Sequence, residues 1–216
     1  MKKIIATIVA LVFSTSAYAV TLSDVSVGAS INHGIYGGNG KEENYTHTGT
    51  LETTTKKDGA AFVDTYATVF VEMALNENVS LGVSYAPDSV DTPQNINSGE
   101  GGLGKTDIKV SAEFEDLTTV YLLAKSDIGV FAKAGYSQMD INVTSENAGT
   151  YNDTDTDGLE FAIGYERDLG EIGVRAELAY HSFDDVKANN GQTDKNEITV
   201  SNMEGATARI SLVKSF

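Results

Sequence analysis

The sequence contains no cysteine and no tryptophan, only two prolines and three histidines, and 15 basic residues against 31 acidic ones. The lack of cysteine excludes a disulfide framework and a thiolate metal site. Three histidines are few for a histidine-based metal centre. A formal net charge of -16 argues against a nucleic-acid partner, because binding a phosphate backbone needs clustered Lys and Arg. The length of 216 residues suits a single domain.

Long apolar runs are also lacking, except at the start of the chain. Lys2 and Lys3 precede an apolar stretch over residues 4–13, and Ala17-Tyr18-Ala19 forms a small-x-small cleavage site. This pattern predicts a secretory signal peptide over residues 1–19, followed by one domain over residues 20–216. The apolar stretch of about ten residues is too short for a membrane anchor, which needs about 20. A lysine-led signal of this kind is typical of an exported bacterial protein.

The mature chain is dominated by alternation of apolar and polar residues, which is the period of a β-strand. The pattern predicts eight strands, over residues 25–35, 63–73, 79–86, 107–124, 130–137, 159–166, 174–181 and 206–216. No helical period follows the signal peptide. The fold class is therefore predicted to be all-β.

The connections between these strands alternate between long and short. The long ones span residues 36–59, 88–106, 144–157 and 184–197, and the short ones span residues 76–78, 126–127 and 169–171. When strands run up and down, alternate connections fall at opposite ends. We therefore predict an eight-stranded antiparallel up-and-down transmembrane β-barrel with four long outer loops and three short periplasmic turns.

Alternation does not say which face is inside, but the polar face has the character of a narrow lumen. It carries small residues, which a solvent-facing surface does not require: Ser80, Gly82, Ser84, Gly135, Ala162, Gly164 and Ala179. It also carries charges of both signs that would pair if enclosed: Glu72, Lys109, Glu113, Lys133, Glu160, Arg175, Glu177 and Arg209. Tyrosines near the strand ends of the apolar face resemble interfacial girdles, with Tyr85, Tyr136 and Tyr180 near the loops and Tyr165 near the turns. The alternative of a soluble periplasmic barrel with reversed faces stays open.

The C-terminal strand carries a family resemblance. The chain ends ISLVKSF, with Phe216 as its last residue, and residues 158–183 form an amphipathic strand pair around an acidic turn. With the signal peptide and the loop asymmetry, the whole mature chain resembles the small eight-stranded outer-membrane barrels of Gram-negative bacteria, the OmpA transmembrane-domain and OmpX-like group. The resemblance implies that the barrel insertion machinery recognises the terminal strand ending at Phe216. Lys214 departs from the aromatic or apolar residue that the family prefers there, although a lysine can extend to the interface.

The fourth strand is imperfect, because Asp116 and Thr118 fall on the lipid-facing phase of Phe114. A β-bulge near residues 115–117 would restore the phase. The alternative is that residues 107–115 project above the membrane.

Two short motifs suggest chemistry without completing it. Residues 153–158 (DTDTDG) match the opening of an EF-hand loop, but the twelfth position is Gly164 where a glutamate is needed. A solvated acidic loop is favoured over a calcium site, and loose Ca²⁺ or Mg²⁺ binding stays open. His181 and Ser182 are adjacent on a strand and so face opposite sides, which prevents a base–nucleophile pair. His33 and His47 have no nucleophile beside them, and we predict no catalytic, cofactor or metal residues.

The enclosed charges fit either a salt-bridged core or a gated pore, and the narrow eight-stranded lumen favours the core. The predicted function is a non-enzymatic outer-membrane protein that supports envelope integrity, adhesion or ligand contact through its loops. The alternatives are a narrow porin for small solutes and an outer-membrane lipid-modifying enzyme. The expected partners are outer-membrane lipids, lipopolysaccharide and the insertion machinery, with no nucleic acid, and the protein is expected to be a monomer.

Overall fold

The computed structural model describes residues 24–92, 95–97, 108–146, 150–191 and 196–216. The predicted signal peptide, residues 1–19, lies outside these residues. The described chain forms eleven β-strands: β1 (Val25–Tyr45), β2 (Leu51–Ala74), β3 (Val79–Tyr85), β4 (Val90–Asp91), β5 (Asn95–Asn97), β6 (Ile108–Lys125), β7 (Val130–Glu146), β8 (Thr154–Leu169), β9 (Ile172–Phe183), β10 (Val186–Asn189) and β11 (Asn196–Ser215). In this part of the chain, no helix is long and apolar enough to cross a membrane.

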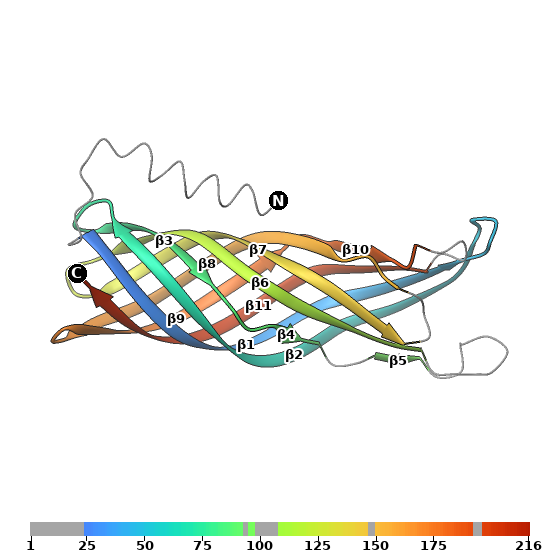
Figure 1. Cartoon of the computed structure of the whole chain (residues 1–216), viewed down its shortest axis with the longest axis horizontal. Helices are drawn as coiled ribbons and strands as arrows, with labels where there is room; N and C mark the ends of the chain where they lie inside the picture. Colours follow the sequence, from blue (N-terminus) through green and yellow to red (C-terminus); the bar gives the residue numbers. More distant parts are fainter. Residues whose placement is uncertain (1–23, 93–94, 98–107, 147–149, 192–195) are drawn as a thin grey trace.

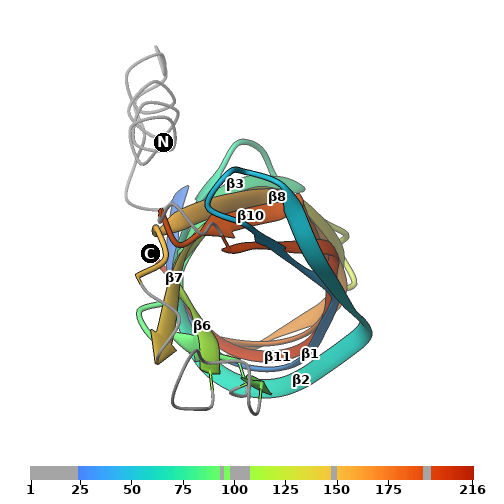
Figure 2. The same cartoon turned by 90° about the vertical axis from the view of Figure 1, so that its right-hand side faces the viewer.

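Eight of these strands close into a ring. Antiparallel neighbours follow the order β1-β2-β3-β6-β7-β8-β9-β11, and β11 pairs back onto β1. The short strands β4 and β5 pair with β6, and β10 pairs with β11. Figure 1 shows the strands inclined to the long axis, and Figure 2 looks along that axis into the ring. The predicted eight-stranded antiparallel barrel is confirmed.

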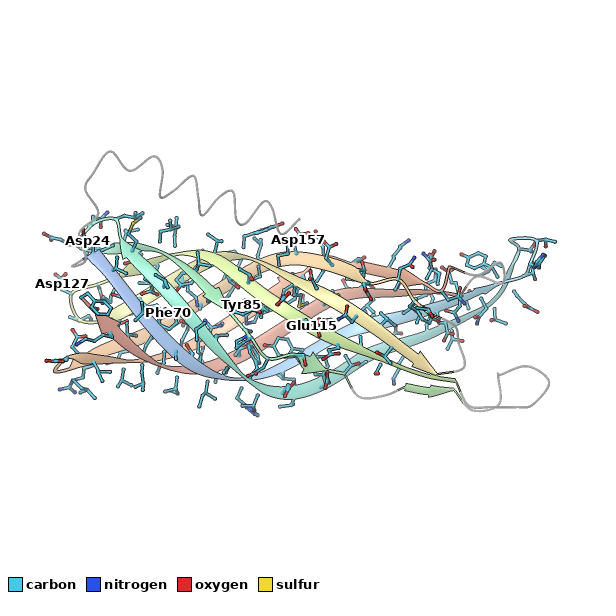
Figure 3. The ribbon with its side chains drawn as sticks, in the orientation of Figure 1. Asp24, Phe70, Tyr85, Glu115, Asp127 and Asp157 are labelled. Atoms are coloured by element: carbon cyan, nitrogen blue, oxygen red, sulfur yellow. The ribbon has the colours of Figure 1, made fainter. Side chains whose placement is uncertain are left out.

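The two ends of the barrel differ as predicted. Three short connections, over residues 75–78, 126–129 and 170–171, join β2 to β3, β6 to β7 and β8 to β9. They lie at the same end as the start of β1 and the end of β11, where Figure 3 labels Asp24 and Asp127. The strand ends that the remaining connections join lie at the opposite end of the barrel, called here the loop end.

The outer and inner faces are distributed as expected for a barrel in lipid. Large apolar side chains are exposed on the outside, among them Ile31, Val71, Leu122, Ile163, Leu178 and Ile210. Charged and polar side chains are buried inside, among them Glu72, Lys133, Glu160, Arg175, Glu177 and Arg209. A protein in water would bury the apolar set, so this arrangement suits a hydrocarbon surrounding.

The prediction of a long loop over residues 36–59 is wrong, because most of these residues belong to strands β1 and β2. β1 and β2 stay paired from Val25–Met73 to Tyr45–Leu51, and only a tight turn around Thr46 joins them. This hairpin continues past the membrane, where water meets both faces and the sequence needs no apolar alternation. Alternation therefore marks the membrane-crossing part of a strand and misses its extension.

The predicted bulge in the fourth strand is confirmed. The register of β6 against β7 shifts between Glu115 and Thr118, and Asp116 has a φ of 55°. Aspartate tolerates this left-handed conformation better than most residues. The Asp116 carboxylate accepts a 2.6 Å hydrogen bond from the Tyr85 hydroxyl, which ties the bulge to β3.

Candidate functional site: the lumen and the outer rim

One group of lumen charges is centred on Arg175 of β9. Its guanidinium donates to both carboxylate oxygens of Glu72 on β2, at 2.7 and 2.8 Å. Its Nε donates to Glu166 on β8 at 2.7 Å, and Glu166 also accepts from Lys125 at 2.7 Å. Because β2 and β9 are not neighbours in the ring, the Arg175–Glu72 pair crosses the lumen.

A second group joins four charged residues of β7, β8, β9 and β11. The Lys133 ammonium lies 2.7 Å from both Glu160 and Glu177. Arg209 donates to Glu177 at 2.5 Å and to Glu160 at 3.2 Å, and also to the side chain of Asn32. All of the predicted lumen charges in these two groups are therefore inside and paired.

Aromatic rings connect the two groups. The Tyr121 hydroxyl donates to Glu72 at 2.8 Å, while the Lys133 ammonium lies 4.8 Å from the centre of the Tyr121 ring. Gly82 makes this possible, because a Cβ there would lie 2.3 Å from the Tyr121 ring. The small lumen residues thus make room for large partners on neighbouring strands, as the composition of the polar face predicted.

Sequence reasoning missed several members of this network. Glu166 shares the strand phase of Glu160, and this phase was the available signal. The rings of Phe70 and Phe131 lie 5.2 Å from the Arg175 guanidinium, but an aromatic residue in a polar phase gives no such signal. The side chain of Lys109, another predicted lumen charge, lies outside the described part of the chain.

His181 faces the lumen, as predicted, and Ser182 does not join it. The His181 Nε2 lies 3.0 Å from the Thr207 hydroxyl, and its Nδ1 lies 3.5 Å from Glu160. Both Thr207 and His181 are almost fully buried, and Glu160 is already held by Lys133 and Arg209. The trio resembles a nucleophile–base–acid arrangement in composition, but its hydroxyl has no open face toward a substrate.

Toward the loop end, the polarity of the two faces reverses. An apolar cluster lies on the inside, formed by Met139, Ile141, Phe183, Val186 and Met203, with Phe114 packed against it. The predicted lumen position of Glu113 is therefore wrong, because it lies on the opposite face of β6 from Phe114. Glu115, on the same outer face, accepts a 2.7 Å hydrogen bond from Asn142. This part of β6 projects above the membrane, where the outer face meets water.

Tyrosines mark the level at which this reversal occurs. The hydroxyl of Tyr136 donates to Asp157 at 2.7 Å, as that of Tyr85 does to Asp116 at 2.6 Å. Tyr180 is likewise hydrogen bonded to Glu204. Each ring is exposed on the outside, and each carboxylate lies toward the loop end. We call these three pairs the outer rim, and they fit an aromatic girdle at the membrane surface.

The acidic motif of residues 153–158 lies largely on a strand. β8 begins at Thr154, and Asp157 belongs to the outer rim, so the residues do not form an EF-hand loop. Within the described residues, no group of three or more His, Cys, Asp or Glu side chains is placed to hold a metal ion. His47 lies in the exposed turn between β1 and β2, and His33 faces outward from β1.

Polar contacts also gather at the loop end. The Asn196 amide donates to Glu42 at 2.5 Å and to Asn44 at 2.6 Å, which ties the start of β11 to β1. Nearby Tyr151 is buried. This burial, with a contribution from the Glu42 charge, raises the pKa of the Tyr151 hydroxyl to about 12.

Comparison with solved structures supports the same architecture. The outer membrane protein OprG from Pseudomonas aeruginosa superposes with a TM-score of 0.56 at 12% identity, covering 88% of this chain and 96% of that one. The outer membrane protease OmpT from Escherichia coli gives a TM-score of 0.49 at 10% identity, covering 88% and 97%. At these identities the likeness to OprG shows the fold alone. Comparison with curated proteins gave no match.

A family comparison places the sequence more firmly. The model of the outer membrane protein β-barrel domain matches residues 5–202, which is most of the chain. This agrees with the closed ring, the apolar outer band and the paired lumen charges described above, and it supports a location in the bacterial outer membrane. The chain belongs to the outer membrane protein β-barrel domain family.

Proposed function

We propose that this protein is a non-enzymatic outer-membrane barrel that acts through its surface at the loop end. The observation that carries the proposal is the length of the β1–β2 hairpin. β1 has 21 residues and β2 has 24, whereas a tilted strand crosses a membrane with about 9–11. About half of each strand is therefore available outside the membrane.

The hairpin is supported along its length. β1 pairs with β11 as far as Asn44–Asn196, so three strands form a continuous extracellular wall. Such a wall holds side chains in fixed positions above the outer rim, which suits adhesion or contact with a surface ligand. A disordered loop of equal length would lose more entropy on binding.

The test compares cells that produce the full protein with cells that produce a variant lacking residues 42–55. We expect the shortened protein to reach the outer membrane and keep a heat-modifiable gel shift, while adhesion of the cells to abiotic and host surfaces falls to that of cells without the protein. Equal adhesion by the full and shortened proteins would contradict the proposal.

We also propose that the protein has no catalytic activity toward lipids. The composition of the Thr207–His181–Glu160 trio makes an outer-membrane lipid-modifying enzyme the second candidate, but the burial of its hydroxyl and the engagement of Glu160 by Arg209 favour a structural role. Mass spectrometry of lipid A from cells with and without the protein tests this. Identical profiles are expected, and a missing acyl chain or phosphate in one profile would support the enzyme.

The proposed partners are membrane lipids, lipopolysaccharide and the barrel insertion machinery, and the proposed state is a monomer. The outer rim supports contact with lipid headgroups, because its tyrosines and carboxylates lie where headgroups begin. Closure of the ring by β1 and β11 supports the monomer, since closure leaves no sheet edge in the membrane. The mass of the purified protein in mild detergent, after subtraction of detergent, measures the oligomeric state.

A further inference from the structure

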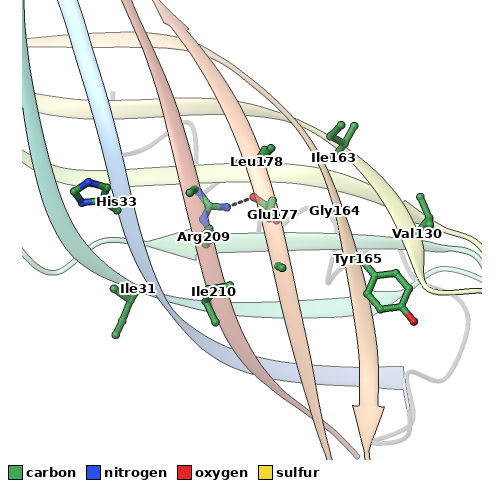
Figure 4. Close-up of a pocket in the computed structure, with 12 residues that line it drawn as sticks. Ile31, His33, Val130, Ile163, Gly164, Tyr165, Glu177, Leu178, Arg209 and Ile210 are labelled. Carbon is green, nitrogen blue, oxygen red and sulfur yellow. Dashed lines mark hydrogen bonds and ion pairs between the residues drawn. The ribbon is translucent and has the colours of Figure 1, made fainter.

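A hollow of about 750 Å³ lies on the wall of the barrel that faces the membrane. It crosses β1, β11, β9 and β8 and reaches the start of β7, as Figure 4 shows. Its outward-facing lining is almost entirely apolar: Ile31, Val130, Ile163, Tyr165, Leu178 and Ile210. The lumen-side pair of Glu177 and Arg209 borders it from within.

Two alanines create the hollow. In the ladders, Ala208 of β11 stands between His33 and Leu178, and Ala176 of β9 stands between Tyr165 and Ile210. The neighbouring Leu178 and Ile163 are 64% and 67% exposed and project outward. Small side chains between projecting ones leave a groove whose walls make only dispersion contacts, which is the environment that an acyl chain requires.

The groove has one polar end. His33 and Thr65 both face outward on neighbouring strands, and the His33 Nδ1 lies 2.8 Å from the Thr65 hydroxyl. When Nδ1 accepts a hydrogen bond from the Thr65 hydroxyl, the His33 Nε2 carries the ring hydrogen and is a donor. A polar side chain on a membrane-facing wall is costly unless it has a partner.

The direction of the groove matches a lipid. Val130 is the first residue of β7, directly after a turn, whereas His33 is the ninth residue of β1. Eight residues of strand at about 3.3 Å each, tilted by about 40°, place His33 about 20 Å above the turn end. The polar end of the groove, at His33, therefore lies in the half of the membrane nearer the outer rim. From there the apolar lining extends toward the bilayer interior.

We propose that this groove binds one acyl chain of a phosphorylated membrane lipid, with the His33 Nε2 donating a hydrogen bond to a phosphate oxygen. The inference rests on the proposed contact with membrane lipids and is independent of the proposed surface role. A second copy of the chain is the competing occupant. That copy would have to place a hydrogen-bond acceptor of its own where the phosphate oxygen would lie, opposite the His33 Nε2.

The test is native mass spectrometry of the full protein, released from mild detergent after exposure to phosphatidylglycerol or to diacylglycerol with the same acyl chains. We expect each wild-type protein to retain one phosphatidylglycerol molecule that the Ala208→Phe variant loses, because the Phe ring fills the groove. The matched control is Ala29→Phe, because Ala29 also faces the membrane from β1 but does not line the hollow. It should retain lipid as the wild type does.

His33→Leu separates the headgroup from the chain. We expect this variant to lose at least fivefold of the preference for phosphatidylglycerol over diacylglycerol, and an excess of inorganic phosphate should not displace the lipid from the wild type. Equal lipid retention by Ala208→Phe and Ala29→Phe would overturn the proposal, as would equal retention of the two lipids by the wild type. A dimer that Ala208→Phe dissociates would assign the groove to a second copy instead. Adhesion is measured separately, so these failures leave the surface role standing.

Discussion

At the scale of single residues, Arg175 shows why the lumen charges act as one bonded unit. Its guanidinium makes a two-point contact with Glu72 and a further bond with Glu166, and it lies 5.2 Å from the ring centres of both Phe70 and Phe131. The planar geometry suits carboxylates on two strands at once. Because these charges are buried, they have lost their hydration, and the bonds to their partners offset that cost.

Replacing Arg175 with leucine is expected to lower the free energy of unfolding by about 3–5 kcal/mol, because Glu72 and Glu166 would keep buried negative charge with fewer partners. Urea unfolding of the refolded protein in detergent micelles, followed by circular dichroism, measures this. The control is Lys187→Ala, since the exposed Lys187 ammonium lies 4.0 Å from Glu197. If both variants unfolded at the wild-type urea concentration, the network would not stabilise the barrel.

At the scale of strands, each long strand carries two opposite polarity patterns. On β7, Lys133 and Ser137 face in at membrane level, whereas Met139 and Ile141 face in above it. The reversal follows from the medium, because the outer face meets hydrocarbon below the outer rim and water above it. A strand with these two patterns can rest at only one depth, so the sequence itself sets the position of the barrel in the bilayer.

This reversal also explains which strand features could be predicted. The alternation at membrane level indicated all eight ring strands, and the phase conflict at Asp116 indicated the bulge. The extensions of β1 and β2 escaped prediction because their polar residues do not alternate. The partners of Arg175 escaped it because β2 and β9 meet across the lumen only after the ring closes, and no local pattern encodes that pairing.

The terminal strand yields a prediction about assembly. β11 pairs with β1 as far as its last residue, Ser215. Beyond it, the Phe216 N–H donates to the Val25 carbonyl at 3.1 Å, while the Phe216 side chain is exposed. Since Phe216 is 53% exposed, Phe216→Ser should refold in detergent with close to wild-type stability. In cells, we expect its outer-membrane level to fall several-fold because the insertion machinery would recognise the strand less well. Quantitative immunoblotting of membrane fractions measures the level, and an unchanged level would remove Phe216 as a recognition element.

At the scale of the whole molecule, the absence of native cysteine permits a clean test of orientation. Thr48 lies in the exposed turn between β1 and β2, and Asp127 lies in a turn at the opposite end. In intact cells, a membrane-impermeant maleimide should label Thr48→Cys and leave Asp127→Cys unlabelled. Both variants should react after the outer membrane is permeabilised. Labelling of Asp127→Cys alone in intact cells would invert the proposed orientation.

The paired charges inside the barrel lead to a prediction about transport. Side-chain bonds cross the barrel from Arg175 to Glu72. Lys133 pairs with Glu160 and Glu177 inside the same barrel, and the apolar cluster lies toward the loop end. An ion would have to break several charge-assisted bonds to pass, so the purified protein should give no steady conductance in planar bilayers. The Glu72→Ala/Arg175→Ala double variant removes both members of the crossing pair, so neither is left as a charge without the other. Small steps of current are expected from this variant. Steady wild-type conductance would show that the lumen charges line a pore, and the same salt bridges would then have to open and close as its gate.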